Sequence, residues 1–494
     1  MRSHKWILVF AFTLLFCFSA CGKNDANAPE SSVPTGESGS EELTELTEEL
    51  PDIPLTADYG GDPFNILTAG NIAYQDFTVD DESSIALDNA QYKRRKKVEE
   101  DYRVQIREDA FVSYSSGGGP GYSKISMAVN SGDCLYDLAL IAGYDVSVLA
   151  YSGYLYDMNS VPGIDLKKSW WDQKANESLS VRGVMFFTTG EITLSDNDAA
   201  FVIMMNKDLL KNYELENPYQ MVYDGTWTWE NFGKLCKAVT EDLNQDGKMD
   251  RNDCFGLLVM DDSSNGVISS VGERCCTIND EGKIELTIYN ETVLSALEQY
   301  FAIAYDTQYA FTYQRVEIGT KLERELWSGN HGLFWTTYMG IVPSFREMES
   351  DFGLLPYPKL NEAQQNYYSL VMPYLSQFIC IPLIQDDLER TGTITEALAY
   401  YGKELVTPAY YDVSLIGQHT RDEESSDMLD IVFANLVYDI GYYYQVGPYN
   451  KHLIYMVREF DTNFASRYEK YRPASENLLA VINDCYARAV DEWK

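Results

Sequence analysis

The residues between Asp242 and Asp253 have the types and the spacing of a calcium-binding loop. Counted from Asp242, side-chain oxygens fall at positions 1, 3, 5, 9 and 12, and Gly247 stands at position 6. In EF-hand-type loops these positions supply oxygen ligands, position 7 offers a backbone carbonyl, and glycine permits the sharp turn. The predicted metal ligands are Asp242, Asn244, Asp246, Lys248, Asp250 and Asp253.

The predicted role of this loop is a structural Ca²⁺ clip. Position 12 is Asp253 in place of the usual bidentate glutamate, and the shorter side chain weakens or reshapes the site. Only one such loop is present, whereas EF-hand sensors work in pairs. The alternative is an acidic surface turn with fortuitous spacing.

Catalytic motifs are missing from the sequence. No G-x-S-x-G, P-loop or H-E-x-x-H pattern occurs, and the glycines at 117–119 and 121 lack the Lys-Ser/Thr of a phosphate cradle, which predicts a flexible loop. Four histidines and no CxxC pattern argue against zinc. With 76 acidic residues, chance pairs of carboxylates are expected, so no pair by itself indicates glycoside hydrolysis.

Aromatic residues are the second chemical feature of the chain, which holds 37 tyrosines and 8 tryptophans. Aromatic faces stack on the apolar faces of sugar rings, while nearby Asp and Asn side chains bind hydroxyl groups. Most of these aromatics are expected in the core, including Trp227 and Trp229 at a helix start. Trp335 ends an apolar strand and is a candidate ligand platform.

The N-terminus has the features of an export signal. Arg2 and Lys5 precede an apolar run over residues 6–18, which is too short to span a bilayer comfortably. Cys21 follows Ser19-Ala20 as in a bacterial lipobox, where the thiol takes a lipid and cleavage leaves it as the N-terminus. The alternative is an ordinary signal peptide cut near Ala20.

Residues 21–60 are expected to form a disordered acidic tether, because they are rich in Ser, Pro, Gly and Glu. No second apolar run of 18 or more residues occurs, so a lipid at Cys21 would be the only membrane attachment. The net charge of −38 argues against nucleic acid and anionic membrane surfaces as partners. We expect a lipid-anchored monomer on the extracellular face of the cell membrane.

The seven cysteines of the body are expected to be buried free thiols, because the number is odd and Cys275 directly precedes Cys276.

The body alternates strand and helix patterns. Apolar runs predict strands at 64–70, 104–106, 136–143 and 201–205, with a helix over 90–102 between the first two. Thr228 is the expected N-cap of a helix over 229–239. This order predicts an α/β fold with mostly parallel sheets flanked by helices, and about 430 residues are enough for two lobes. Ligands bind beyond the carboxyl ends of strands in such sheets, where Asn71, Tyr144 and Asp145 fall.

Several segments, in order, resemble the family 1 extracellular solute-binding proteins that feed sugar ABC transporters. The lipobox and tether are followed by Tyr136-Asp137-Leu138, by Asn206-Lys207-Asp208 and by Gly225-Thr226-Trp227-Thr228-Trp229. The 328–335 strand, the G-x-x-P-x-P pattern from Gly353 to Pro358, and segments at 408–411 and 420–425 are similar to later parts of the family. The resemblance covers residues 62–494.

The resemblance implies a periplasmic-binding-protein-like fold in which two lobes, joined by crossing strands, close over a solute. Lobe 1 would comprise 62–188 and about 365–405, and lobe 2 would comprise 189–362 and about 406–494, after a signal peptide at 1–20. The chain would capture a mono- or oligosaccharide and deliver it to ABC transporter permease subunits without chemistry. The implied ligand-binding residues are Tyr144, Asp145, Asp196, Asn197, Asp198 and Trp335.

Two other classes of protein stay open at this point. A tethered glycoside hydrolase would need two carboxylates across the cleft. A calcium-dependent cell-surface binding module would use the 242–253 loop and would lack a solute cleft.

Overall fold

Four strands form the first sheet of this computed structural model, which describes residues 49–72, 76–79, 85–318, 321–411 and 423–492. Strand β1 (Asp62–Gly70) lies between β2 (Val104–Val112) and β3 (Leu138–Ala142) and is parallel to both. Strand β13 (Gln377–Cys380) comes from late in the chain and pairs antiparallel with β3. The strands expected at 64–70 and 136–143 are confirmed, and the one expected at 104–106 extends to Val112.

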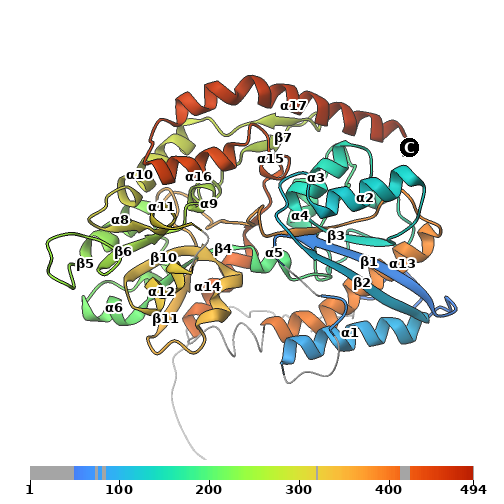
Figure 1. The fold of residues 1–494 in the computed structure, drawn as a ribbon, viewed down its shortest axis with the longest axis horizontal. Coiled ribbons are helices and arrows are strands. Elements are labelled where there is room, and N and C mark those ends of the chain that lie inside the picture. The colour runs from blue at the N-terminus through green and yellow to red at the C-terminus, as the bar shows by residue number, and fades with distance from the viewer. Residues whose placement is uncertain (1–48, 73–75, 80–84, 319–320, 412–422, 493–494) are drawn as a thin grey trace, which may run out of the picture. The chain divides into compact units, whose positions relative to one another are not determined.

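Helices lie on both faces of this sheet (Figure 1). The chain moves outward from β1 to β2 through α1 (Ala86–Tyr102) and back to β3 through α2 (Pro120–Ser131). Because parallel crossovers are right-handed, this reversal places α1 and α2 on opposite faces. Gly132, at φ 77°, ends α2 in the left-handed conformation that glycine adopts without strain. Two further helices belong to this lobe, α3 (Gly143–Tyr151) and α13 (Leu388–Tyr401).

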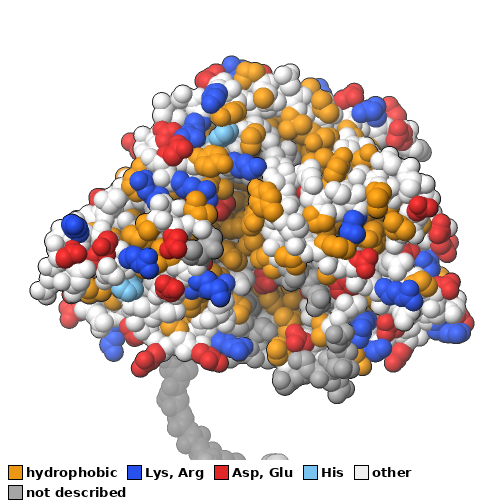
Figure 2. Space-filling model, in the orientation of Figure 1, with side chains coloured by type: hydrophobic (Ala, Val, Ile, Leu, Met, Phe, Trp, Pro, Cys, Tyr) orange, Lys and Arg blue, Asp and Glu red, His pale blue; other side chains and the backbone are white. Residues whose placement is uncertain are grey.

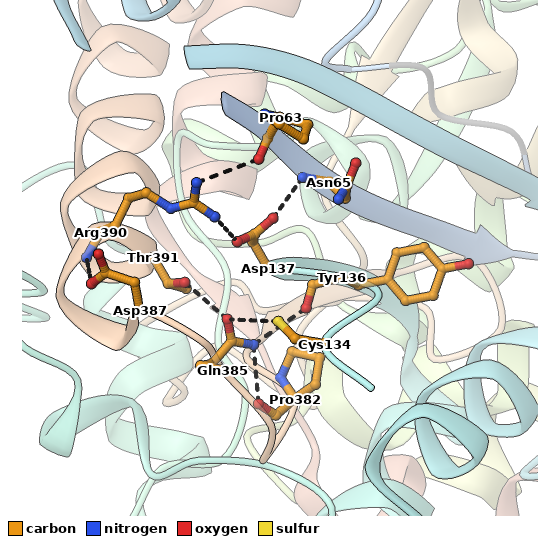
Figure 3. Close-up of polar contacts among 10 residues, drawn as sticks. All are labelled: Pro63, Asn65, Cys134, Tyr136, Asp137, Pro382, Gln385, Asp387, Arg390 and Thr391. Carbon is orange, nitrogen blue, oxygen red and sulfur yellow. Dashed lines mark hydrogen bonds and ion pairs between the residues drawn. The ribbon is translucent and has the colours of Figure 1, made fainter. Parts of the chain in front are cut away.

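A buried ion pair joins β3 to β1 and to α13 (Figure 3). Asp137 accepts hydrogen bonds from the backbone N–H of Asn65, at 2.7 Å, and from the Arg390 guanidinium, at 2.6 Å. Arg390 also bonds the carbonyl of Pro63. Since only 6% of the Asp137 side chain and 16% of the Arg390 side chain are exposed, removal of either charge would leave the other largely buried without a balancing charge. This contact lies at the amino end of β3 and fixes the strand whose carboxyl end leads to Tyr144.

The second sheet is more mixed than the sequence predicted. Three of its five pairings are antiparallel. Two of them, with β10 and β11, arise because the chain enters β4 from the connection between the lobes and runs against both neighbours, and the third joins β5 to β6. The other two pairings, β6 with β10 and β6 with β9, are parallel. Its strands are β4 (Phe201–Asn206), β5 (Thr240–Glu241), β6 (Cys254–Val259), β9 (Ala310–Thr312), β10 (Gly332–Tyr338) and β11 (Phe352–Leu355).

Aromatic packing holds the helices of this second lobe to its sheet. Thr228 caps α8 through the backbone N–H of Asn231, as expected, and Trp229 packs edge-on to Phe232 and Tyr300 at 5.5 and 5.4 Å between ring centroids. Trp227 and Trp229 are therefore core residues, as expected. The helices are α6 (Lys207–Asn212), α7 (Pro218–Tyr223), α8 (Trp229–Ala238), α9 (Ser263–Ser270), α10 (Glu291–Ala304), α11 (Tyr313–Val316), α12 (Leu322–Ser328), α14 (Glu423–Ala434) and the 3₁₀ helix η2 (Met339–Phe345).

Crossing segments connect the two sheets. Residues 188–200 lead from the first sheet to β4 and contain the short helix α5 (Ser195–Asp198), while residues 371–377 return to β13. The two segments run antiparallel, with bridges between Thr188 and Ile379 and between Ala200 and Val371. A third connection leaves α13 through the π-helix η3 (Gly402–Val406). The two-lobed α/β fold is confirmed, while the exact lobe boundaries stay predictions.

The C-terminal helices contact both lobes. Helix α16 (Tyr449–Glu459) packs on α9 of the second lobe, and α17 (Phe464–Glu492) contacts α3 of the first. Asn483 of α17 exchanges two 2.9 Å hydrogen bonds with the backbone of Ile284 in the second lobe. Figure 1 shows α17 running along the top of both lobes. The remaining elements are η1 (Met158–Ser160), α4 (Gln173–Leu179), β7 (Cys276–Ile278), β8 (Ile284–Leu286), β12 (Ser369–Leu370), β14 (Leu436–Val437) and α15 (Ile440–Tyr443).

The packed body begins before the expected end of the tether at residue 60. Contacts group the chain from Leu50 onward as one compact unit. Ile53 is buried, and Pro54 accepts a 2.8 Å hydrogen bond from the Tyr102 hydroxyl, so residues 50–60 are anchored on α1. The predicted signal peptide at 1–20, the predicted lipid site Cys21 and residues 22–48 lie outside the described residues.

The described cysteines are free thiols, and six of these seven are buried. Among the described helices, none combines the length and the apolar character needed to cross a bilayer.

Candidate functional site

Polar and aromatic side chains gather where strands of both sheets end. Asn71 follows β1, Tyr114 follows β2 and Tyr144 follows β3, while Asp262 follows β6 and Tyr338 ends β10. These are the carboxyl ends of the strands, where α/β proteins bind ligands. Figure 2 shows the surface hollowed between the two lobes. We refer to the space bounded by these five residues and Tyr374 as the cleft.

Tyrosines supply the aromatic faces of the cleft. Tyr114 of the first lobe and Tyr374 of the crossing segment have ring centroids 6.1 Å apart, and 65% and 37% of their surfaces are exposed. Burial raises the pKa of the Tyr374 hydroxyl, and Tyr114 and Asp262 raise it further. Burial likewise raises the pKa of Tyr338, with Glu323, Asp198 and Asp262 adding to the shift and Arg324 opposing it. Tyrosines from both lobes and the crossing segment thus share the electrostatic environment of Asp262.

A pair of neighbouring carboxyl groups lies on the second-lobe side of the cleft. Asp261 is buried and forms an ion pair with Arg458 of α16. Asp262 is half-buried at the start of α9. Burial raises the pKa of Asp262 well above its usual range, and the charge and hydrogen bond of Asp261 raise it further. The pair therefore holds a proton more tightly than two separate carboxyl groups would.

Asn450 joins the lobes at the cleft. Its amide donates a 2.6 Å hydrogen bond to the hydroxyl of Tyr144, and its backbone carbonyl accepts one of 3.5 Å from the Asn265 amide. Tyr144 belongs to the first lobe, whereas Asn265 belongs to α9 and Asn450 to α16. If the lobes separate by a hinge motion, either the hydrogen bond between Tyr144 and Asn450 breaks, or Asn450 moves with the first lobe and its contact with Asn265 breaks.

The glycine-rich segment 115–119 is held in place, contrary to the flexible loop expected from its composition. Asp145 is buried, and its Oδ1 accepts the backbone N–H groups of Gly117 at 2.9 Å and Gly119 at 3.1 Å. The loop then presents Ser116, whose hydroxyl accepts a 3.1 Å hydrogen bond from Lys451 of α16. Glycine is needed here because a Cβ at position 119 would lie 2.5 Å from Asp145 Oδ2. Asp145 therefore positions a loop that touches the other lobe.

The ligand-binding residues implied by the sequence do not all meet in the cleft. Tyr144 lies in it, and Asp145 supports its glycine loop. Asp198 accepts a 2.9 Å hydrogen bond from Tyr410 and lies close enough to Tyr338 to affect its pKa.

Trp335 is fully buried, which corrects its expected role as a ligand platform. Its neighbours are Trp327 and Phe345 at 5.7 and 5.6 Å between centroids, and its indole N–H points to the Tyr313 hydroxyl at 3.3 Å. Strand β10 is covered on both faces, so its side chains face the core on either side.

Asp196 and Asn197 line a different hollow, on the crossing segment. This cavity of about 330 Å³ has acidic and aromatic walls. The side chain of Asp196 is buried and accepts a hydrogen bond from Thr189 at 3.0 Å, and the Tyr438 hydroxyl lies 3.2 Å from the same carboxyl group. Its neighbours in the lining include Trp171, Asp172, Glu191, Asn197 and Tyr411.

Four of the residues that bound the cleft were not identified from the sequence, namely Asp262, Tyr114, Tyr338 and Tyr374. Asp262 follows an apolar run that ends at Met260, the same signal that singled out Tyr144, so it could have been found. Tyr114 follows the alternating strand that ends at Val112 and carries a similar signal. Tyr374 lies on a crossing segment, where no periodic pattern marks its position.

The predicted calcium loop has the backbone of a tight acidic turn. Gly247, at φ 81°, makes the sharp bend, and Asp242 accepts the N–H groups of Asp246 and Gly247 at 3.2 and 2.7 Å. Asp253 is buried and accepts those of Leu243 and Asp250 at 3.0 and 2.7 Å. Within the part of the chain that the structure describes, no three His, Cys, Asp or Glu side chains are arranged to hold a metal ion. The oxygen-rich donor set fits Ca²⁺, and its binding stays a prediction.

The fold and the cleft define a two-lobed α/β binding protein. Residues 108–358 match the model of the bacterial extracellular solute-binding protein family, which is just over half of the 494 residues, so the chain belongs to this family. Comparison with curated proteins finds no match.

Solved structures support the same fold. An ABC substrate-binding protein from Listeria monocytogenes, in complex with cycloalternan, is 16% identical with a TM-score of 0.52 over 86% of this chain and 99% of its own. A sugar transporter from Rhizobium etli in an open conformation is 12% identical, with a TM-score of 0.56 over 84% and 98%. A solute-binding protein from Thermotoga lettingae, bound with α-D-tagatose, is 16% identical, with a TM-score of 0.50 over 85% and 100%.

Proposed function

We propose that this chain is the carbohydrate receptor of an ABC importer and that it binds a mono- or oligosaccharide in the cleft. The observation that carries the proposal is the gathering of Tyr114, Tyr144, Tyr338 and Asp262 at strand ends of both lobes, with Tyr374 of the crossing segment beside them. Tyrosine faces suit the apolar faces of sugar rings, and carboxyl and amide groups suit their hydroxyls. Solved proteins of the same fold in complex with cycloalternan and with tagatose are consistent with such a ligand.

Capture follows from the positions of these groups on two lobes. A sugar that touches Tyr114 and Tyr338 together makes more contacts when the lobes are closed than when they are apart. Since a ligand shifts an equilibrium only by its differential affinity for the two states, these contacts favour closure. Asn450 and Lys451 add contacts between the lobes that do not involve the ligand. The closed form would then dock on the permease subunits, and no bond in the solute is made or broken.

Attachment to the cell follows from the N-terminal sequence. We propose that Cys21 carries the lipid, that the acidic segment after it spaces the monomeric receptor from the outer face of the membrane, and that residues 1–20 are removed. The net charge of −38 argues against nucleic acid as a partner.

The test is calorimetric titration of the full chain without its signal peptide against a panel of neutral mono- and oligosaccharides, with small-angle scattering of each complex. We expect at least one sugar to bind and the radius of gyration to fall on binding. Tyr338→Ala should weaken that sugar about tenfold, because it removes one stacking face. Tyr223→Ala, on the exposed surface of α7, is the matched control and should bind normally. Cleavage of the sugar, or an unchanged radius at saturation, would rule out capture without chemistry.

We propose, separately, that Ca²⁺ binds the 242–253 loop and stabilises the second lobe. Asp242, Asn244, Asp246 and Asp250 with the carbonyl of Lys248 would hold the ion, and Asp253 would close the loop at its base. At a free Ca²⁺ concentration 100 times the dissociation constant, binding stabilises the folded chain by about 2.7 kcal/mol. Added Ca²⁺ should therefore raise the melting temperature. Asp242→Asn with Asp246→Asn should abolish the rise, whereas Asp224→Asn in the same lobe should retain it. An unchanged melting temperature at about 10 mM Ca²⁺, above the range of weak sites, would contradict the proposal.

A further inference from the structure

Asp262 is a carboxyl group at the cleft without an ion-pair partner among the described residues, so only its ionised form would need a balancing charge from outside the protein. Asp261 has Arg458 as its ion-pair partner, and Lys451 donates to Ser116. The structure records no ion pair for Asp262 within the described residues, although Arg458 acts on it at longer range. Two carboxyl groups therefore share one guanidinium, and one negative charge is left over whenever both are ionised.

Two buried hydrogen-bond acceptors without donors belong to α9, whose N-cap is Asp262, and to α16, which packs on α9. Asn265 stands three residues after Asp262, on the same side of the first turn of α9. Its Oδ1 and the Oδ1 of Asn450 have no partner among the described residues. Only 4% of the surface of Asn265 and 2% of that of Asn450 are exposed. Their amide nitrogens are already engaged, that of Asn450 with Tyr144 and that of Asn265 with the Asn450 carbonyl. The site has spare acceptors, so its ligand must bring donors.

The aromatic side chains near Asp262 favour a positive charge as well. The hydroxyls of Tyr144 and Tyr374 lie within the electrostatic reach of Asp262, and the Tyr114 ring is next to that of Tyr374. The face of an aromatic ring attracts cations, most strongly where water is partly excluded. A hydroxyl group on the ligand would both donate and accept hydrogen bonds. An ammonium group on the ligand only donates, and its positive charge would balance an ionised Asp262.

We propose that the cleft selects a carbohydrate that bears a protonated amine, an amino sugar, and that Asp262 binds its ammonium group. The ammonium balances the charge of Asp262, and the donors of the ligand reach the free oxygens of Asn265 and Asn450. This inference rests on the proposed function, because it names the substrate class of the same cleft.

The experiment is calorimetric titration with matched sugars that differ at one substituent. The pairs are glucosamine and glucose, galactosamine and galactose, mannosamine and mannose, and deacetylated chitobiose and cellobiose, with the N-acetylated form of each amine as a third member. We expect at least one amine to bind about tenfold or more tightly than its hydroxyl twin, since hydrogen bonds to charged groups are stronger than neutral ones. The N-acetylated form should lose that advantage because it is neutral.

Asp262→Asn tests the residue itself. Asparagine has the same shape and is as good at a helix start as aspartate, so α9 should stay folded, which the melting temperature checks. In this variant the amino sugar should bind about as tightly as the matched sugar with a hydroxyl group, so the preference is lost. The affinity for the hydroxyl sugar should change little. Asp133→Asn, an exposed carboxyl group on the first lobe, is the matched control and should keep the full preference.

The outcomes separate this inference from the function on which it rests. If neutral sugars bind and no amine is preferred, or if Asp262→Asn keeps the preference, the amino-sugar inference is overturned while carbohydrate capture stands. If no sugar of any kind binds, both are overturned.

Discussion

Replacing Trp335 by alanine is expected to destabilise the second lobe by about 3–5 kcal/mol, the usual cost of truncating a buried tryptophan. The indole is fully buried on β10 among Trp327, Phe345 and Tyr313. The loss combines the transfer free energy of the indole with the free energy of the remaining cavity. Urea denaturation followed by circular dichroism measures the change in the free energy of unfolding.

A second variant makes this result decisive about the role of Trp335. Tyr114→Ala removes a ring that is 65% exposed, so its stability should change by less than about 0.5 kcal/mol, while sugar affinity should fall. Trp335→Ala should show the reverse pattern, a large loss of stability with near-normal affinity below its melting temperature. Should Trp335→Ala remain as stable as the parent and lose the sugar, the indole would be a ligand platform and its place in the core would be wrong.

Local patterns predicted the elements that local physics determines. The strand at 201–205 is a continuous apolar run buried on both faces, and Thr228 precedes the helix that its hydroxyl caps. The bend at Gly247 is likewise set by neighbouring residues. In each case the interacting groups lie within a few positions of one another, which is why the sequence alone was sufficient.

The errors concern contacts between distant segments. Trp335 looked like the end of an apolar strand, but β10 continues to Tyr338, lies between β4 and β6 and is buried on both faces at Trp335. Asp145 follows β3 as a ligand residue would, yet it accepts N–H groups from a loop 26 to 28 positions earlier. The direction of β4 depends on the connection between the lobes, so the mixed second sheet could not be read from alternating strands and helices.

Asp196 shows the same limit most clearly, because its environment is assembled from three distant parts of the chain. The carboxyl group is buried on the crossing segment beside Asp172, and the Tyr438 hydroxyl lies 2.8 Å from Asp172 and 3.2 Å from Asp196. A hydroxyl has one proton, so Tyr438 can donate to one of the two carboxyl groups only. With Asp172 as the acceptor at the shorter distance, a protonated Asp196 can donate to the Tyr438 oxygen.

Stability is therefore expected to fall as pH rises between about 4 and about 8, through Asp196. Burial, followed by the charge of Asp172, raises the pKa of Asp196 from 3.8 to about 8. In this window the folded chain keeps a proton that the unfolded chain has released, so the stabilisation is complete below about 4 and is lost as pH approaches 8. The slope for one such group is about 1.4 kcal/mol per pH unit.

Asp196→Asn should remove this dependence. Its amide can donate to the Tyr438 and Thr189 oxygens in place of the carboxyl proton, while Oδ1 still accepts the N–H of Asn197. The difference in the free energy of unfolding between variant and parent, measured by urea denaturation at pH 5, 6, 7 and 8, should therefore grow in favour of the variant. Asp133→Asn, on the exposed surface, should run parallel to the parent.

Buried groups away from the Asp196 pocket affect both proteins equally and cancel in that difference. Burial raises the pKa of Glu396 to about 7 and that of Asp439 to about 6, so both lower stability with rising pH as Asp196 does. Burial lowers the pKa of His452 to about 4, which has the opposite effect, because the unfolded imidazole takes up a proton below about 6.5. All three lie outside the Asp196 pocket and are unchanged in the variant.

Parallel profiles for Asp196→Asn and the parent would thus mean that Asp196 is ionised in the folded chain and that Tyr438 donates to both carboxylates in turn.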